Sequence, residues 1–118
     1  MIIDSHCHLE YEPISLDLTE TISRANKDGV KFLLTISTTD NSLKKILKIT
    51  SDFNCVYGTY GIHPHEAKNH RSIKSHEIIK KVNSSKKIIG IGETGLDFYY
   101  NHSEKKDQME CFEEHINA

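Results

Sequence analysis

The sequence predicts an α/β fold in which parallel strands alternate with helices. Three observations indicate it: short apolar runs recur along the chain, a segment with helical spacing of apolar residues follows each run, and one such unit takes roughly thirty residues. No low-complexity segment and no linker rich in Pro, Gly or Ser interrupts the pattern. The 118 residues are enough for one domain with a modest core.

The first half of the chain supplies two of these units. Residues 2–8, IIDSHCH, are expected to form a strand, and residues 15–28 a helix that ends at Gly29. Residues 31–37, KFLLTIS, form a nearly continuous apolar run, which is typical of a strand buried on both faces. A second helix is expected from about residue 39, where capping residues precede apolar side chains at helical spacing.

The second half repeats the pattern twice. Residues 56–62, VYGTYGI, are aromatic and β-branched enough for a third strand, and residues 76–83 suggest a short helix. Residues 87–93, KIIGIGE, are expected to form a fourth strand. Ser103 can cap a last helix that carries apolar side chains on one stripe. The sequence therefore predicts about four strands and four helices.

Composition narrows the class of protein. The formal net charge of −2 gives no global attraction to nucleic acid or to an anionic membrane, and no apolar run is long enough to span a bilayer. The N-terminus lacks the pattern of a secretory signal, and the three cysteines are far apart without a C-x-x-C pair. Reduced thiols and a cytoplasmic location are therefore expected. Paired lysines occur on helical or loop stretches without interleaved aromatic residues, so they are interpreted as solvated.

The first strand carries a pattern of polar residues that is typical of a metal site. Side chains alternate across a strand, so Asp4, His6 and His8 are expected on one face and Cys7 on the other. Two neutral imidazoles at the carboxyl end of a strand can converge on one metal ion. The alternative is that these histidines are structural polar residues at a strand end, with their hydrogen bonds satisfied. A lone His-x-His motif favours this alternative.

Two further strand ends carry residues of the same chemistry. Glu93 ends the fourth apolar run, and His63 and His65 end the third around Pro64. Functional groups gather at the carboxyl ends of parallel strands, so these side chains are expected near His6 and His8. A loop-capping or lysine-paired carboxylate is the alternative for Glu93. The remaining histidines, in polar or helical stretches, are interpreted as surface residues.

Other interpretations of these motifs are weaker. Residues 90–95 match G-x-G-x-x-G, but a dinucleotide-binding turn needs a helix to open there, and the next helix is expected only near Ser103. Glu93 would also place negative charge in the phosphate loop. A nucleotide-binding domain is thus an alternative of low weight. Cys7 as a nucleophile is a minor alternative, because a small buried residue fits its position better.

The three motifs DSHCHLE, GIHPHEA and IGETGLDFYY resemble those of TatD-type metal-dependent hydrolases, a family of amidohydrolase-like TIM barrels. They occur in the order and spacing of that family's N-terminal half, and the resemblance covers essentially the whole chain. It implies a divalent-metal-dependent hydrolase, usually a deoxyribonuclease, that cleaves phosphodiester bonds of DNA by metal-activated water. A small phosphoester or another hydrolysable bond is the open alternative.

The resemblance also implies roles for individual residues. His6 and His8 would bind one metal ion, and Glu93 would be a carboxylate ligand that bridges two. His63 and His65 lie in a signature loop near the site and are interpreted as substrate-binding. A complete family site holds two divalent cations, and zinc, manganese and magnesium are not distinguished by the sequence.

The length of the chain departs from the family pattern. A closed (β/α)8 barrel takes about 250 residues, whereas four units supply half of one. Residues 1–118 are therefore expected to be a single truncated domain. The resemblance implies further metal ligands on later strands, two histidines and an aspartate that acts as the general base, and these would be missing here. We expect either a homodimer or a separate C-terminal half to cover the open sheet, and no membrane association. An inactive half-barrel that acts only as a binding fragment is the alternative function.

Overall fold

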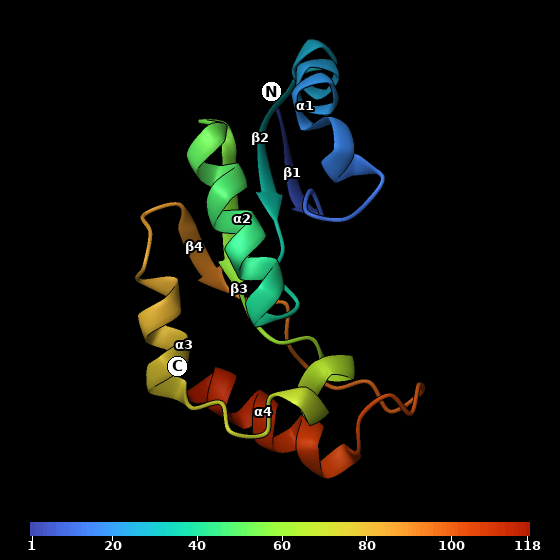
Figure 1. The fold of residues 1–118 in the computed structure, drawn as a ribbon, viewed down its shortest axis with the longest axis vertical. Helices are drawn as coiled ribbons and strands as arrows, with labels where there is room; N and C mark the ends of the chain where they lie inside the picture. Colours follow the sequence, from blue (N-terminus) through green and yellow to red (C-terminus); the bar gives the residue numbers. More distant parts are fainter.

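The strands form one parallel sheet, in the spatial order β1-β2-β3-β4 (Figure 1). The computed structural model describes residues 1–118. The strands are β1 (Ile2–Cys7), β2 (Val30–Thr35), β3 (Val56–Tyr60) and β4 (Ile88–Ile91). The α-helices are α1 (Leu18–Lys27), α2 (Asp40–Asp52), α3 (Ser75–Val82) and α4 (Lys105–Asn117), with 3-10 turns η1 (Ile14–Asp17) and η2 (Pro64–Asn69). The predicted α/β fold with parallel strands and four helices is confirmed.

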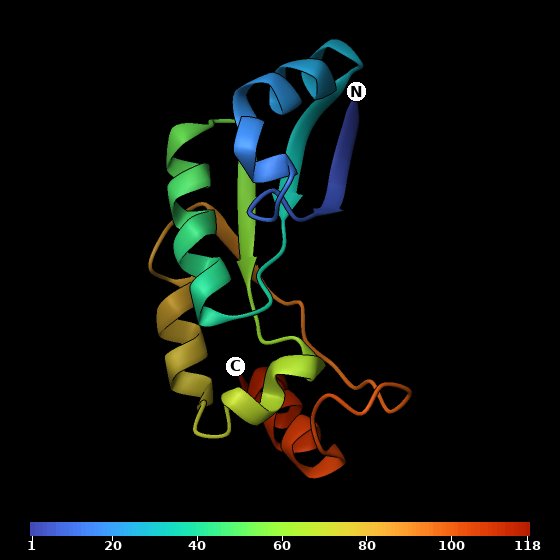
Figure 2. The same ribbon diagram turned by 45° about the vertical axis from the view of Figure 1, so that its right-hand side comes forward.

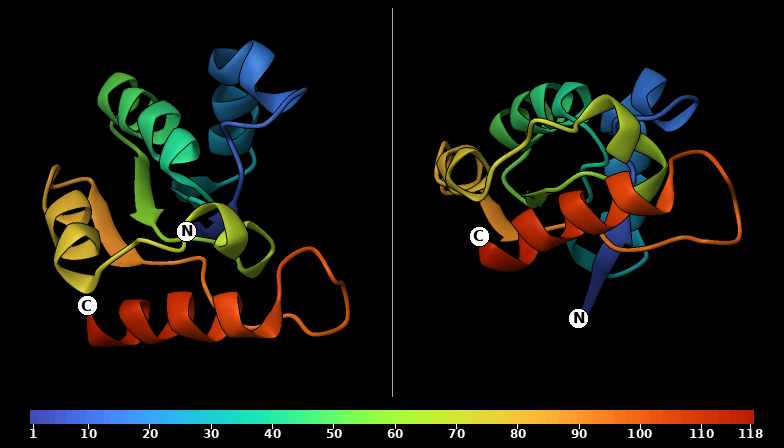
Figure 3. Two further views of the ribbon diagram at one scale, coloured as in Figure 1. Left: turned by 60° about the horizontal axis from the view of Figure 1, so that its bottom comes forward. Right: turned by 90° about the horizontal axis from the view of Figure 1, so that it is seen from below.

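The helices lie on one face of the sheet and at one of its ends. Helices α1, α2 and α3 pack against the strands on one side, which leaves the opposite face open (Figure 2). Helix α4 packs against η2 and α3, and the view from below shows it crossing beneath the ends of the strands (Figure 3). None of the helices combines the length and the apolar character that crossing a membrane would require.

The local sequence explains where the second helix starts. The Thr39 hydroxyl accepts the Ser42 backbone N–H at 3.1 Å, and the Ser42 hydroxyl accepts the Thr39 N–H at 3.0 Å. This reciprocal cap satisfies N–H groups that the first turn of a helix leaves without partners. Helix α2 therefore begins beside the end of β2, and its apolar stripe faces the sheet.

The core lies between the sheet and the helices, in two clusters of buried side chains. One cluster joins α2, α3 and α4 to β3 and β4, and the other joins α1 and α2 to β2 and β3; their members are Leu43, Ile46, Tyr60, Ile62, Ala67, Ile73, Ile78, Ile88 and Cys111, and Leu9, Ile22, Leu33, Ile49 and Val56. Gly58 keeps β3 close to α2, because a Cβ there would lie 2.5 Å from Ile46 Cγ2. Burying each large aliphatic side chain contributes about 1.5–3 kcal/mol.

The face of the sheet without helices is apolar and exposed. Phe32 keeps 40% of its surface exposed and Ile89 keeps 59%, although their neighbours in sequence Leu33 and Ile88 are buried under the helices. The expectation that residues 31–37 form a strand buried on both faces is therefore wrong for this chain. The reason is that no segment of residues 1–118 packs on the second face, where apolar side chains nevertheless line a shallow groove of about 300 Å³.

A buried histidine holds α4 at the end of the sheet. His115 is only 4% exposed; its Nε2 accepts the Ile62 N–H at 3.1 Å, and its Nδ1–H donates to the Cys111 carbonyl at 2.7 Å. The interpretation of His115 as a surface residue is thus wrong, whereas His76 and His102 are indeed exposed. Burial lowers the pKa of His115, and His70 adds to that effect while Cys111 and Glu114 oppose it.

This contact predicts an acid-sensitive contribution to stability. Because only the neutral ring can accept the Ile62 N–H, the folded chain resists a proton that the unfolded chain takes up near pH 6.5. The free energy of unfolding should therefore fall as pH decreases from 6.5 toward the lowered pKa of His115. We expect His115→Ala to cost about 1–3 kcal/mol at pH 7.5, since it leaves a buried N–H without a partner.

Urea unfolding at pH 7.5 and pH 5.5 measures the effect. The difference between wild type and His115→Ala should be smaller at the lower pH, because the wild type alone loses this contact on acidification. His76→Ala is the control, since His76 is exposed on α3. An equal difference at both pH values would contradict the role given to the neutral ring.

Candidate functional site

Three histidines surround one glutamate at the carboxyl ends of the strands. Glu93 Oε2 lies 2.9 Å from His6 Nε2 and 4.0 Å from His8 Nε2. Glu93 Oε1 lies 3.4 Å from His63 Nε2. These side chains come from β1, from the residue after β1, from the end of β3 and from the loop after β4. The structure thus brings together four of the five residues that the sequence singled out.

An irregularity in β1 sets the direction of His6. Asp4 stands opposite Leu33 of β2 and Cys7 stands opposite Thr35, so Ser5 and His6 together face one residue of β2. Such a bulge interrupts the alternation of side chains. The His6 N–H donates to Asp4 Oδ1 at 3.1 Å within it. The expectation that Asp4 shares a face with His6 is therefore wrong, because the extra residue turns the strand between them.

Cys7 faces away from the histidines, as the alternation of side chains predicts. Its side chain packs against the core cluster under the helices, and its thiol donates to the Leu34 carbonyl at 3.4 Å. Burial, with smaller effects of Asp4 and Glu10, raises the pKa of the Cys7 thiol to about 12. A thiol of that pKa is a poor nucleophile, so the position of Cys7 disfavours the minor alternative of cysteine chemistry.

Backbone contacts between strand ends hold Glu93. Its N–H donates to the Ser37 carbonyl at 2.9 Å, and the Gly92 N–H donates to the Tyr60 carbonyl at 2.8 Å. Gly61 makes this approach feasible: a Cβ on Gly61 would lie 2.6 Å from the Gly92 carbonyl carbon and 2.8 Å from the Glu93 oxygen. The position of the carboxylate therefore depends on a residue without a side chain on the neighbouring strand.

The hydrogen bonds of His8 fix which ring nitrogen faces Glu93. His8 Nδ1 lies 3.0 Å from the Ile36 carbonyl, which can only accept, so Nδ1 carries the proton in the neutral ring. The lone pair of Nε2 then points toward Glu93. The buried carboxylate of Glu10 supports the same tautomer, because its Oε1 lies 3.5 Å from His8 Nδ1. The Tyr11 ring stacks on the imidazole at 5.2 Å.

His63 has the opposite arrangement. Its Nδ1 accepts the His65 N–H at 3.1 Å, so the neutral ring carries its proton on Nε2, which faces Glu93. Burial lowers the pKa of His63, and the charge of Glu93 partly offsets that effect. His63 is therefore arranged to donate a hydrogen bond to the carboxylate, whereas His8 is arranged to offer a lone pair.

His65 does not reach Glu93. Its Nε2 lies 2.7 Å from Asp97 Oδ2, and this hydrogen bond is the main cause that lowers the pKa of Asp97. Asp97 Oδ1 accepts the backbone N–H groups of Tyr99 and Tyr100 at 3.0 and 3.2 Å. His65 thus contacts the loop that follows Glu93, residues 94–102. The sequence reasoning missed Asp97, whose only signal is its position four residues after Glu93.

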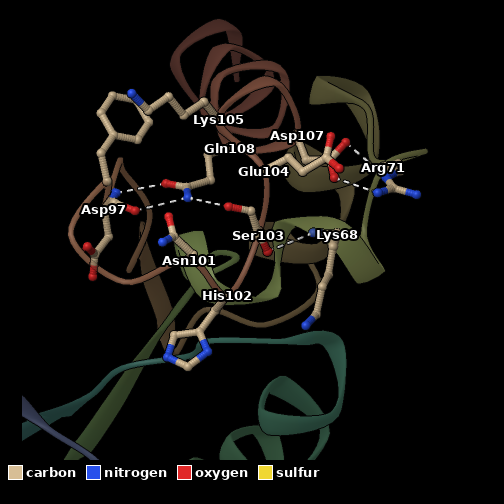
Figure 4. Close-up of a pocket in the computed structure, with 11 residues that line it drawn as sticks. Lys68, Arg71, Asp97, Asn101, His102, Ser103, Glu104, Lys105, Asp107 and Gln108 are labelled. Atoms are coloured by element: carbon tan, nitrogen blue, oxygen red, sulfur yellow. Dashed lines mark hydrogen bonds and ion pairs between the residues drawn. The ribbon is translucent and has the colours of Figure 1, made fainter.

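Helix α4 anchors the base of that loop. Gln108 is almost fully buried; its Oε1 accepts the Asp97 N–H, and its Nε2 donates to the carbonyls of Asp97 and Ser103 (Figure 4). Arg71 makes two hydrogen bonds to Asp107 on the same helix. The hollow of about 280 Å³ between these residues is lined largely by side chains that already pair with each other. We therefore interpret it as a structural contact between the loop and α4.

A cleft of about 780 Å³ opens beside the histidines. His6, His63 and Glu93 line one part of it, and the loop as far as Tyr99 lines the rest. A smaller hollow of about 270 Å³ lies on the other side of Glu93, against His8 and Tyr11. The carboxylate is therefore accessible from the open side of the sheet.

The donor atoms suit a divalent metal ion. One ligand atom from each of His6, His8 and Glu93 lies within 4.8 Å of the others. Neutral imidazole and carboxylate are a donor set that zinc and similar metals accept.

The sequence of residues 3–118 matches the family model described as TatD related DNase. The chain belongs to this family. The TatD resemblance of its three motifs is thereby confirmed, and the nucleotide-binding alternative is disfavoured. No helix follows residues 90–95 until α4 begins at Lys105, so the glycine motif lacks the helix N-terminus that a pyrophosphate needs.

Relatives in the TatD family are more than twice as long as this chain. A protein of Buchnera aphidicola subsp. Baizongia pistaciae named an uncharacterized metal-dependent hydrolase is 37% identical over 99% of this chain and 44% of its own length. YcfH of Escherichia coli K12, with the same description, is 30% identical over 98% and 43%. The 3'-5' ssDNA/RNA exonuclease TatD of Salmonella typhimurium is 28% identical over 95% and 43%.

A solved structure supports the fold. The TatD homologue YjjV of Escherichia coli K12 superposes with a TM-score of 0.83 at 23% identity, over 98% of this chain and 45% of YjjV. The four-stranded sheet thus corresponds to less than half of a larger fold. The part of this chain that superposes on YjjV includes the open face of the sheet.

The close approach at Gly61 predicts a sensitive position. In Gly61→Ala the new methyl group would overlap the backbone of Gly92, so we expect a loss of about 1–3 kcal/mol in the free energy of unfolding. Gly90→Ala is the matched control, because a Cβ there would lie 3.6 Å from Thr59 Cγ2, an ordinary contact. Urea unfolding of both variants makes the comparison, and equal losses would contradict the argument.

Proposed function

We propose that this chain provides the first part of the metal site of a hydrolase that cleaves phosphodiester bonds in nucleic acid. The observation that carries the proposal is the convergence of His6, His8 and Glu93 at the open end of the sheet. Membership in the family described as TatD related DNase supports the substrate, as does the relative named as an ssDNA/RNA exonuclease. We propose a divalent cation as the cofactor, in keeping with the relatives named as metal-dependent hydrolases.

Each side chain at the proposed metal site would have its own role. His6 and His8 approach the site from β1 and Glu93 from the loop after β4, which leaves the cleft side free for substrate. The Ile36 carbonyl holds the proton of His8 on Nδ1, and the Nε2–H of His63 steadies Glu93 Oε1. A bound divalent cation would stabilise the negative charge of the transition state and make water more acidic.

None of these residues is proposed as the general base. Glu93 is engaged by His6 and His63. His8 Nδ1 is engaged by the Ile36 carbonyl. We propose instead that the base and further ligands come from a polypeptide that covers the open face of the sheet. The relatives' greater length supports this, since the chain matches only 43–47% of several of them.

The open face itself favours such a covering segment. An apolar surface extends across all the strands; it consists of the exposed Ile3, Phe32 and Ile89 and the half-buried Leu34 and Tyr57. The outer strands β1 and β4 each have one edge without a partner strand. Exposed apolar faces and free edges promote association. A separate segment that continues the sheet is the occupant we propose, and a second copy of the chain is the alternative.

The metal site predicts which substitutions weaken ion binding. Calorimetric titration with Mn²⁺ should give one site, and His8→Ala and Glu93→Ala should each lower its affinity at least about tenfold, because each removes a donor. Glu10→Gln should lower it to a smaller extent, since it changes the carboxylate behind His8. The control His76→Ala should bind as the wild type does. Equal affinity in the wild type, His8→Ala and Glu93→Ala would refute the site.

The covering segment predicts low activity of the chain by itself. With Mn²⁺, cleavage of single-stranded DNA should be very slow and should rise at least about tenfold when a polypeptide with the later strands is added, because that polypeptide would complete the ligand set. Sizing chromatography run in parallel should show a complex of the two. His6→Ala should abolish the gain.

Two results would count against this proposal. Strong metal-dependent cleavage by a monomer of the chain alone, abolished by His6→Ala, would show that no second segment is needed. A stable complex without any cleavage would favour the alternative of an inactive fragment that only binds.

A further inference from the structure

A row of rings runs outward from the candidate site. The His63 and His65 rings lie 4.4 Å apart between centroids, and His65 lies 4.5 Å from His102. His102 stacks on Tyr100 at 5.8 Å with an interplanar angle of 28°, and Tyr100 lies 4.8 Å from Tyr99. We call these five residues the aromatic row. It begins at the carboxylate of Glu93 and ends at the surface.

The outer end of the aromatic row is exposed to an unusual degree. Tyr99 keeps 84% of its surface exposed and Tyr100 keeps 54%, and Phe98 next to them is also exposed. Single exposed rings are common, but three consecutive ones form a contiguous apolar patch, which marks a contact surface. These rings lie outside both core clusters.

Hydrogen bonds hold the backbone of the loop that carries these rings. Asp97 accepts the N–H groups of Tyr99 and Tyr100 through Oδ1 and contacts His65 through Oδ2. Gln108 of α4 fixes the Asp97 backbone from the other side (Figure 4). A surface fixed in advance loses little conformational entropy when a ligand binds. The loop backbone therefore holds the exposed rings at the surface before a ligand binds.

Two of the exposed rings, Phe98 and Tyr99, share one cleft with the carboxylate, and Tyr100 lies next to Tyr99. The hollow of about 780 Å³ has His6, His63 and Glu93 in one part and Phe98 and Tyr99 in another. Lys105 lines the neighbouring hollow and adds positive charge next to this end of the cleft, since its Nζ lies 5.0 Å from the centroid of the Phe98 ring. A molecule that spans this cleft would meet the metal-binding side chains His6 and Glu93 at one end. At the other end it would meet the aromatic rings, with Lys105 nearby.

We propose that Tyr99 and Tyr100 form a stacking site for an unpaired nucleobase of the substrate strand. Every base has a flat face that stacks on an aromatic ring, and the phosphate beside it carries the charge that Lys105 can meet. A base inside a duplex has neighbours on both faces, so this site selects a single-stranded or frayed end. The inference rests on the proposed function, because it assigns the reacting phosphodiester to the Glu93 end of the cleft.

The chain offers a direct probe of stacking, because it contains no tryptophan. Tyr99→Trp introduces a single indole at an exposed position, where it should not disturb folding. In buffer with EDTA, so that no strand is cleaved, a short single-stranded oligonucleotide should quench the indole emission. An abasic oligomer of the same length and charge should leave it almost unchanged. Equal quenching by both, or none by either, overturns the proposal.

Affinity measurements test the native rings. By fluorescence anisotropy of a labelled single strand, Tyr99→Ala and Tyr100→Ala should each weaken binding roughly five- to a hundredfold, as expected for the loss of one stacked base. Tyr99→Phe should bind like the wild type, because the ring rather than the hydroxyl makes the contact. Ile116→Ala is the control, since this exposed apolar side chain lies near the C-terminus of α4, far from the loop (Figure 1). Unchanged affinity in both alanine variants overturns the proposal.

This test separates the stacking site from the proposed hydrolase. If the oligonucleotide stacks but the chain binds no Mn²⁺, the stacking site stands and the proposed metal site fails. If Mn²⁺ binds through His8 and Glu93 while base-bearing and abasic strands bind equally, the metal site stands and the stacking site fails.

Discussion

The approach of the Gly61 backbone to Gly92 and Glu93 is the contact on which the site depends. At this point the ends of β3 and β4 come closer than any side chain would permit. The N–H groups of Gly92 and Glu93 donate across the gap to the carbonyls of Tyr60 and Ser37. These bonds place a carboxylate opposite the histidines of β1, which lies at the other edge of the sheet. If the two strand ends moved apart, Glu93 would be separated from His6 and His8.

Much of this arrangement could be predicted from the sequence, and the exceptions have physical causes. The alternation of apolar runs and helical stripes is enough to predict four parallel strands, because burial controls both periods. It is not enough to predict the irregularity between Asp4 and Cys7, since an extra residue changes the face of a side chain without changing the composition. His115 was missed for a related reason: its hydrogen-bond partners, Ile62 and Cys111, include one far away in sequence.

The same reasoning explains what was missed around the loop. Residues 94–102 show no periodicity, so nothing local predicts that Asp97 anchors them to His65. No aromatic residue is interleaved with the lysine pairs in the sequence. The exposed aromatic rings lie instead on the loop that follows the carboxylate, where the fold brings Tyr100 beside His65. Contacts of this kind depend on tertiary structure, which short-range patterns do not encode.

Helix α4 is attached to the rest of the protein mainly by directional polar contacts, and this limits how it can move. Asp107 pairs with Arg71, Gln108 with Asp97, and His115 with the backbone of Ile62. A helix that packs only through apolar side chains can shift along its groove at modest cost. A shift of one residue here would rotate the helix by about 100° and break all three attachments together. Helix α4 therefore has one register against η2 and α3, and the loop that carries Tyr99 takes its position from that register.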